Sequence, residues 1–174
     1  MANQKESKVT PMSFQEEGEA ALAAWGKTLT REQADNFSTT AGIMLSQAKY
    51  RQASFLARIV CESGFVEDRH IIGLAFCYFV QGEFTDTLEI LKRTEPKSYE
   101  AMFYALRGES HFKLGHMGEA KPDLKAVLEN EKPDNALYTN AYMMMSAVER
   151  AQSGQQVKKA GKLPSSSRAA KKRK

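Results

Sequence analysis

The sequence predicts an all-α protein built as a stack of helical hairpins, and three observations support this prediction. Apolar residues recur at spacings of three and four, as in Leu124, Val127 and Leu128, which is the period of a helix face. No stretch of the sequence shows the sustained alternation of apolar and polar residues that marks a strand. Similar short windows begin at positions 48, 82 and 115, so a unit of 34 or 33 residues is repeated.

Length and composition set limits on the class of protein. The chain has 174 residues, of which 42% are apolar and 26% are charged, as in one globular domain. The longest apolar run, 71–80, is shorter than the roughly 20 residues of a membrane helix. The N-terminus has no apolar stretch of the kind found in a secretory signal. We therefore expect a cytoplasmic protein in which Cys61 and Cys77 are reduced, packed thiols.

Charge is unevenly distributed along the chain. Residues 154–174 contain eight basic residues and no acidic one, which leaves 17 basic against 21 acidic residues in positions 1–153. The segment 153–174 also has Gly, Ser and Pro, so we expect a disordered basic tail, most simply a solubilising one. A bipartite nuclear import signal and non-specific binding of nucleic acid or an anionic membrane are alternatives. The tail has no aromatic residue, which argues against base stacking.

Helix-breaking residues divide the rest of the chain. Residues 1–12 are polar and contain Pro11, so we expect a flexible N-terminus. Five positions are expected to interrupt helices between about 13 and 152, namely Gly64, Gly82, Pro96, Gly115 and Pro133. Each recurring window has one small residue seven positions before its start and another five positions after it: Ala41 and Ala53, Ala75 and Thr87, Gly108 and Ala120. Small residues at a crossing let two helices approach closely.

The windows resemble tetratricopeptide repeats, whose period is 34 residues. The third window is the most similar, because it has the family's residues at the family's offsets: Tyr104, Gly108, His111, Gly115, Ala120, Leu124 and Leu128. The resemblance implies repeats at 34–67, 68–100 and 101–134. An N-terminal helical segment would precede them within a domain spanning 13–152, and a helix at 135–152 would cap the stack. An unrelated helical bundle is the alternative.

Four stretches in order resemble a narrower family, the class II chaperones of bacterial type III secretion systems. They are 26–29 before the first repeat, 49–53 with 60–61, 72–77, and 108–120. The resemblance implies a chaperone in the bacterial cytoplasm that holds hydrophobic translocator proteins. It also implies a homodimer formed through the N-terminal segment, here near Phe14–Leu29. Where related chaperones have aromatic residues on the first repeat's inner helix, this chain has Ser38, Gly42 and Leu45.

The concave surface of a repeat stack is the expected binding site. By the family's geometry, the inward-facing residues are Ser38, Gly42, Leu45, Arg69, Ile72, Phe76, Phe79, Met102, Ala105, Glu109 and Phe112. Large apolar residues predominate, which suits an extended apolar peptide anchored by the three phenylalanines. Packing against the N-terminal segment is the alternative. The run Met143–Met145 is interpreted as a buried part of the capping helix, or as an adaptable contact for cargo.

No motif indicates an enzyme, a cofactor or a metal site. His70, His111 and His116 have no second ligand at metal spacing, and the two cysteines are not closely paired. No Gly-rich phosphate loop and no recognisable nucleophile are present in the sequence. The leading hypothesis is therefore a non-enzymatic secretion chaperone. A scaffold that joins folded partners, and a chaperone of a needle or filament subunit, are the alternatives.

Overall fold

The structure is a computed structural model that describes residues 14–95 and 100–160. Within these ranges all regular elements are α-helices, which confirms the predicted fold class. The eight helices are α1 (Phe14–Gly26), α2 (Arg31–Ser46), α3 (Tyr50–Cys61), α4 (Asp68–Val80), α5 (Phe84–Leu91), α6 (Ala101–Lys113), α7 (Met117–Asn130) and α8 (Ala136–Ala160).

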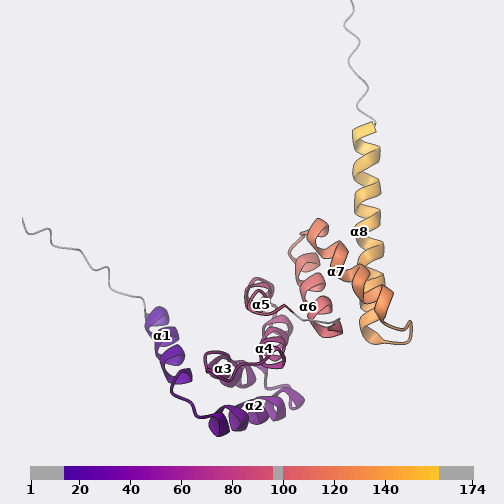
Figure 1. Ribbon diagram of the computed structural model, residues 1–174. Coiled ribbons are helices and arrows are strands. Elements are labelled where there is room, and N and C mark those ends of the chain that lie inside the picture. Colours follow the sequence, from indigo (N-terminus) through magenta and orange to yellow (C-terminus); the bar gives the residue numbers. More distant parts are fainter. Residues whose placement is uncertain (1–13, 96–99, 161–174) are drawn as a thin grey trace, which may run out of the picture.

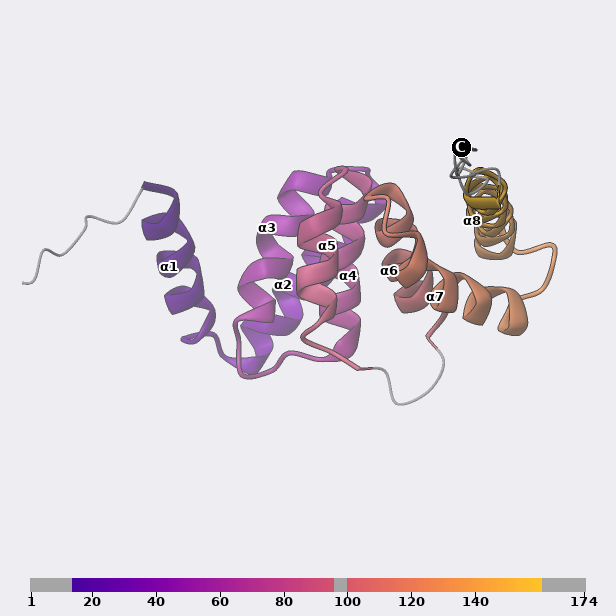
Figure 2. The ribbon, with the colours of Figure 1, turned by 90° about the horizontal axis from the view of Figure 1, so that it is seen from above.

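Six of the helices form three hairpins that stack along an arc (Figure 1). Helix α2 packs on α3, α4 on α5 and α6 on α7, and the hairpins meet through α3 with α4 and α5 with α6. Helix α1 contacts α3 at one end of the arc, and α8 covers α7 at the other. Figure 2 shows the same order from above. As a result, α2, α4 and α6 lie along one side of the arc, and α3, α5 and α7 lie along the other.

The same turn joins the two helices of every hairpin. Its central residue has a positive φ in each case, 57° at Ala48, 81° at Gly82 and 80° at Gly115. The amide of the following residue donates to the carbonyl five residues earlier: Lys49 to Met44 at 2.9 Å, Glu83 to Tyr78 at 3.0 Å and His116 to His111 at 2.8 Å. This hydrogen bond is the signature of a Schellman motif. The three windows recognised in the sequence are therefore three copies of one structural unit.

Small residues lie where the two helices of a hairpin cross. Ala53, Ala75, Thr87 and Ala120 have no exposed surface, and Ala41 is 6% exposed. At Gly108 an added Cβ would lie 3.0 Å from the Cβ of Asp123 and 3.3 Å from the Cδ2 of Leu124. The side chain of Arg107 holds the same crossing from outside, since its Nε and Nη2 donate to the Asp123 carboxylate at 2.8 and 2.6 Å. Close helix contact thus fixes the geometry of each hairpin.

Two buried apolar clusters run through the stack. The first joins the first and second hairpins to α6 and contains Ala57, Cys61, Ile71, Leu74, Ala75, Ile90, Leu91, Phe103 and Leu106. The second joins the third hairpin to α8 and contains Ala105, Ala120, Leu124, Val127, Ala141 and Met145. Met145 is buried in it and Met144 packs at its edge, whereas Met143 is 58% exposed. The methionine run is therefore partly core and partly surface.

Two element boundaries differ from those expected. The first hairpin begins at Arg31 rather than at 34, because Thr30 and Gln33 form a capping box: the Thr30 hydroxyl accepts from the Gln33 amide, and the Gln33 side chain accepts from the Thr30 amide. Helix α8 continues to Ala160, whereas a disordered tail was expected from 153. Gln, Lys and Ala are good helix formers, so the lack of apolar residues does not end the helix there.

Other expectations are met or fall outside the described residues. The second and third repeats start where expected, at Asp68 and Ala101. The flexible N-terminus at 1–12, the break at Pro96 and residues 161–174 of the tail lie outside the described ranges. None of the helices in those ranges is long and apolar enough to span a membrane.

The first turn differs from the other two because a β-carbon occupies the positive-φ position. An alanine in this conformation is strained, and glycine is not. We expect Ala48→Gly to raise the free energy of unfolding by about 0.5–1 kcal/mol, since relief of strain outweighs the entropy lost by glycine. Chemical denaturation measures the change. The matched control, Gly115→Ala, should lower stability by a similar amount, and a fall in stability for both variants would contradict this account.

Candidate concave groove

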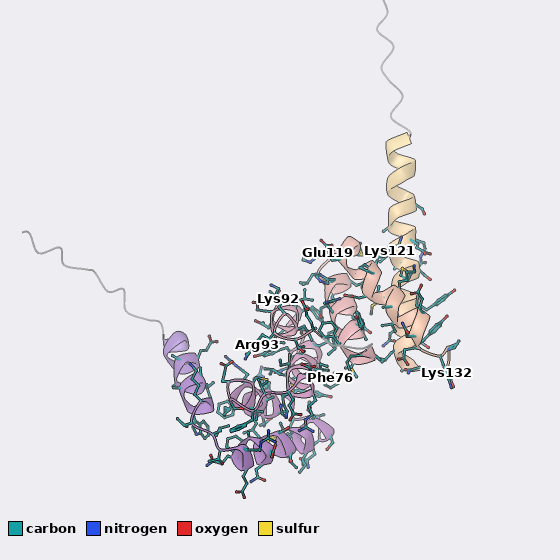
Figure 3. The ribbon with its side chains drawn as sticks, viewed as in Figure 1. Phe76, Lys92, Arg93, Glu119, Lys121 and Lys132 are labelled. Atoms are coloured by element: carbon teal, nitrogen blue, oxygen red, sulfur yellow. The ribbon has the colours of Figure 1, made fainter. Side chains whose placement is uncertain are left out.

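The predicted groove residues lie on the side of the arc formed by α2, α4 and α6. On α4 the spacing of three and four residues brings Arg69, Ile72 and Phe76 to one face. Figure 3 shows Phe76 on this side and Lys92 and Arg93, which follow α5, on the opposite side. Two adjacent cavities open here, and together they define what we call the groove.

The first cavity, of about 180 Å³, lies between α2, α3 and α4. Four predicted residues line it: Ser38, Gly42, Leu45 and Arg69. The other lining residues are all apolar or small except His70, and they are Ala41, Ala57, Val60, His70 and Gly73. An added Cβ at Gly42 or Gly73 would meet nothing within 4 Å. The absence of a side chain at these two positions therefore leaves room in the cavity rather than serving a close helix contact.

The second cavity, of about 340 Å³, lies between α4 and the start of α6. It is lined by Asp68, Arg69, Ile72, Gly73, Phe76, Glu100 and Met102. Arg69 and Gly73 line both cavities, so the two are continuous along α4. Seven of the eleven predicted residues are thus brought together: Ser38, Gly42, Leu45, Arg69, Ile72, Phe76 and Met102.

The remaining four predicted residues are mainly packed. Phe79 is partly buried against the first cluster, with its ring edge-on to that of Phe84 at 5.6 Å. Ala105 is buried in the second cluster, and Phe112 packs against that cluster. Glu109 lies between them on α6 and is only 8% exposed. Phe79, Ala105 and Phe112 therefore support the groove from behind, whereas Glu109 is a buried charge.

Sequence reasoning missed three polar residues of the cavities. Asp68 and Glu100 flank the start of their helices and line the second cavity. His70 lines the first cavity, where its Nδ1 accepts a hydrogen bond from the Glu67 amide at 3.0 Å and its Nε2 is buried with no partner among the described residues. Burial, reinforced by the charge of Arg69, lowers the pKa of His70, so the neutral ring carries its proton on Nε2. Capping-box spacing after Glu67 was the one signal in the sequence for this histidine.

Carboxylates outnumber free cations in the groove. Arg69 is exposed and its Nε lies 3.0 Å from the Glu67 carboxylate. Asp68 accepts a hydrogen bond from the hydroxyl of Thr94. Burial raises the pKa of the Glu109 carboxyl, with Lys113 acting in the opposite direction. The site thus combines an apolar floor with acidic groups at its margin.

A larger cavity of about 650 Å³ opens on the other side, between α5 and α6. Its size follows from the shortness of α5, which has 8 residues where α7 has 14. Two of its cations are paired with carboxylates: Lys92 lies 2.6 Å from Glu89, and Arg107 binds Asp123. The two cavities of the groove have a more apolar lining than this cavity.

The two thiols have no chemical role in this site. Both are buried, and burial raises the pKa of Cys61 to about 12 and that of Cys77 to about 11. Thiols held in the protonated form are poor nucleophiles and poor metal ligands. Among the described residues no group of three or more His, Cys, Asp or Glu is placed to hold a metal ion.

Phe76 and Phe79 have different surroundings although they are one helical turn apart. Phe79→Ala removes packing from the core and from Phe84, so we expect it to lower the free energy of unfolding by about 3 kcal/mol. Phe76 packs on the same cluster but also borders the second cavity, so we expect Phe76→Ala to have a smaller cost of about 1 kcal/mol. Thermal and urea denaturation compare the two, and an equal or reversed order would contradict the assignment of Phe76 to the cavity wall.

Comparison with known proteins identifies the fold of this chain. The family model for anaphase-promoting complex, cyclosome, subunit 3, matches residues 46–127. The crystal structure of PcrH from Pseudomonas aeruginosa is similar with a TM-score of 0.58 and 18% identity, covering 71% of this chain and 96% of that one. No curated protein matches the sequence.

A second solved structure is a peptide complex. The first tetratricopeptide domain of Spaghetti (RPAP3), bound to the HSP90 peptide SRMEEVD, has a TM-score of 0.61 and 22% identity, and covers 72% of this chain and 97% of that one. These matches show that the chain has the tetratricopeptide-type fold of stacked helical hairpins. The peptide bound there is acidic, whereas the groove described here has carboxylates at its margin.

Proposed function

We propose that this protein is a non-enzymatic chaperone of a bacterial type III secretion system. It binds an extended apolar segment of a hydrophobic translocator protein in the groove while both are in the cytoplasm. The bound segment is thereby kept from aggregation and from premature insertion into a membrane, and it remains competent for export. The proposal rests on the resemblance of four sequence stretches to class II chaperones and on the shape and lining of the groove.

The single observation that carries the proposal is a two-part apolar groove that the described residues leave unfilled. Its floor is made by Leu45, Ile72, Phe76 and Met102, and its depth by Gly42 and Gly73. Glycine within a helix costs about 1 kcal/mol relative to alanine, and neither glycine is needed for helix contact. Space kept at such a cost suits pockets that receive apolar side chains of a partner.

The N-terminal segment is a further part of this proposal. Leu22 of α1 and Leu29, in the connection between α1 and α2, dock this segment on its own chain by packing with Ala34 and Ile59. Trp25 stays 47% exposed although its ring meets that of Phe37 edge-on at 5.6 Å. A homodimer formed through this segment, as the resemblance implies, would cover the exposed part of the indole.

A scaffold that joins folded proteins is the second candidate. It is favoured by exposed aromatic and apolar side chains away from the groove, since Tyr142 and Met143 on α8 are 59% and 58% exposed.

Copurification of the tagged chain with the products of neighbouring genes distinguishes the chaperone from the scaffold. Recovery of an apolar secreted protein that binds as short unfolded peptides supports the chaperone; recovery of only folded partners supports the scaffold and overturns the chaperone.

Filling the groove from within tests its role directly. Gly73 lies inside α4 and borders both cavities, so Gly73→Leu should place a side chain in the space intended for cargo. We expect binding of an apolar translocator peptide to fall at least tenfold, about 1.4 kcal/mol, while stability stays the same or rises. Isothermal titration and thermal denaturation measure the two quantities. Gly118→Leu, on the exposed start of α7, is the matched control. Full binding by Gly73→Leu would exclude the groove as the site.

A further inference from the structure

Glu109 is a buried carboxylate for which the described part of the chain supplies no partner. The residue is 8% exposed, its carboxylate keeps some contact with solvent, and no hydrogen bond or ion pair among the described residues reaches it. Lys113, the cation that acts against the raised pKa, is one turn further along the same helix and is exposed. Burial of a charged group without a partner is costly, so proteins rarely keep one without a reason.

Glu109 lies on the same face of α6 as a residue of the groove, beyond the two cavities that define the groove. It follows Met102 by seven residues, which is two helical turns, so both lie on the same face of α6. Met102 lines the second cavity. Ala105 and Phe112, on the flank of this face, pack in the cluster that α8 completes through Ala141 and Met145. Glu109 is therefore at the end of the groove nearest α8, beyond the cavity that would hold an apolar anchor.

The second cavity of the groove is lined by further negatively charged residues. Asp68 and Glu100 line the second cavity, and the nearby cation Arg69 is paired with Glu67. The structurally similar RPAP3 domain binds the acidic peptide SRMEEVD, and such a peptide would meet repulsion here. The charge of this groove suits a ligand of the opposite sign.

We propose that the groove selects an extended peptide in which a lysine or arginine follows the apolar anchors, and that the Glu109 carboxylate binds this cation. The inference rests on the proposed function, because it specifies the chemistry of the cargo segment in the same groove. A long aliphatic stem can pass over the apolar floor while its charged end reaches the buried carboxylate. A charge-assisted hydrogen bond formed there is stronger than one between neutral groups.

The stability of the free protein gives a separate readout. The pKa of Glu109 is raised by burial, so the ionised form is disfavoured in the fold relative to the unfolded chain. Its charge therefore destabilises the fold progressively as the pH rises above the ordinary pKa of a glutamate. Replacement by the neutral, isosteric glutamine removes this charge. Glu109→Gln should raise the melting temperature at neutral pH, whereas a residue with a structural role would lower it.

The experiment uses the full chain and two series of short synthetic peptides. In one series, leucines are spaced along a Ser/Asn chain and a single lysine is moved one position at a time after the last leucine; in the other, norleucine replaces the lysine. Affinities are measured by fluorescence anisotropy for the wild type, for Glu109→Gln and for the control Glu119→Gln. Glu119 is exposed in the first turn of α7 and outside the groove.

We expect the wild type and Glu119→Gln to prefer one lysine register over its norleucine counterpart. Glu109→Gln should lose about tenfold in affinity for that lysine peptide and nothing for the norleucine peptide. An unchanged preference in Glu109→Gln, or a lowered melting temperature, would overturn the inference while leaving the apolar groove intact. If the wild type binds neither series, the proposed function itself fails.

The chain's own basic segment is the competing occupant, since eight basic residues lie within 154–174. A variant that ends after Ser153 distinguishes binding of this basic segment from binding of a cargo peptide. If the segment is not the occupant, this variant has the lysine preference of the full chain. If truncation abolishes the effect of Glu109→Gln on stability and raises the affinity for lysine peptides, the segment occupies the carboxylate and the cargo assignment is wrong.

Discussion

Close contact between the two helices of each hairpin is the constraint on which the structure depends. The α6–α7 crossing shows it best, because Gly108 leaves no room for a β-carbon beside Asp123 and Leu124. Fully buried small residues hold the equivalent contacts in the other hairpins. Since each hairpin buries one face of its first helix against its second, the opposite face of α2, α4 and α6 is left free. Stacking then aligns these free faces into one groove (Figures 1 and 3).

Those parts of the fold that depend on local, repeated rules could be predicted from the sequence. The turns at Gly82 and Gly115 and the small residues at the crossings are examples, because each has the same physical requirement in every repeat. Seven of the residues that the geometry of the resembled family places inward line the two cavities. The rest depend on packing that the repeat pattern does not specify: Phe84, just past the turn, packs edge-on against Phe79, and the distant helix α8 completes the cluster that holds Ala105 and Phe112. The extent of α8 also escaped prediction, since helix propensity rather than apolar content carries it to Ala160.

Glycines at the helix crossing and in the turns meet a requirement of the fold. At Gly108 the close approach of Asp123 and Leu124 on the neighbouring helix favours the missing side chain, and at Gly82 and Gly115 a positive φ favours it. Gly42 and Gly73 meet neither requirement, since both have helical backbones with open space above them. Folding would be favoured by alanine at both positions. Gly118 has the same open space outside the groove, so what distinguishes Gly42 and Gly73 is that they line the two continuous cavities, which is where the proposed binding would use the space.

Two buried carboxylates on adjacent helices, Asp123 and Glu109, can be compared in the same way. Asp123 on α7 is 3% exposed, and Arg107 on α6 compensates it with two hydrogen bonds at 2.6 and 2.8 Å. Glu109, two residues after Arg107 on the same helix, is buried to a similar degree and has no such partner within the described ranges. Where a buried carboxylate lies between two packed helices, as Asp123 does, the chain thus supplies a cation from the neighbouring helix. The two carboxylates differ in position, because Asp123 meets Arg107 across the α6–α7 hairpin, whereas Glu109 lies on the face of α6 that also holds Met102 of the groove. A group that is uncompensated only on that face is best explained by a partner that arrives from outside the chain.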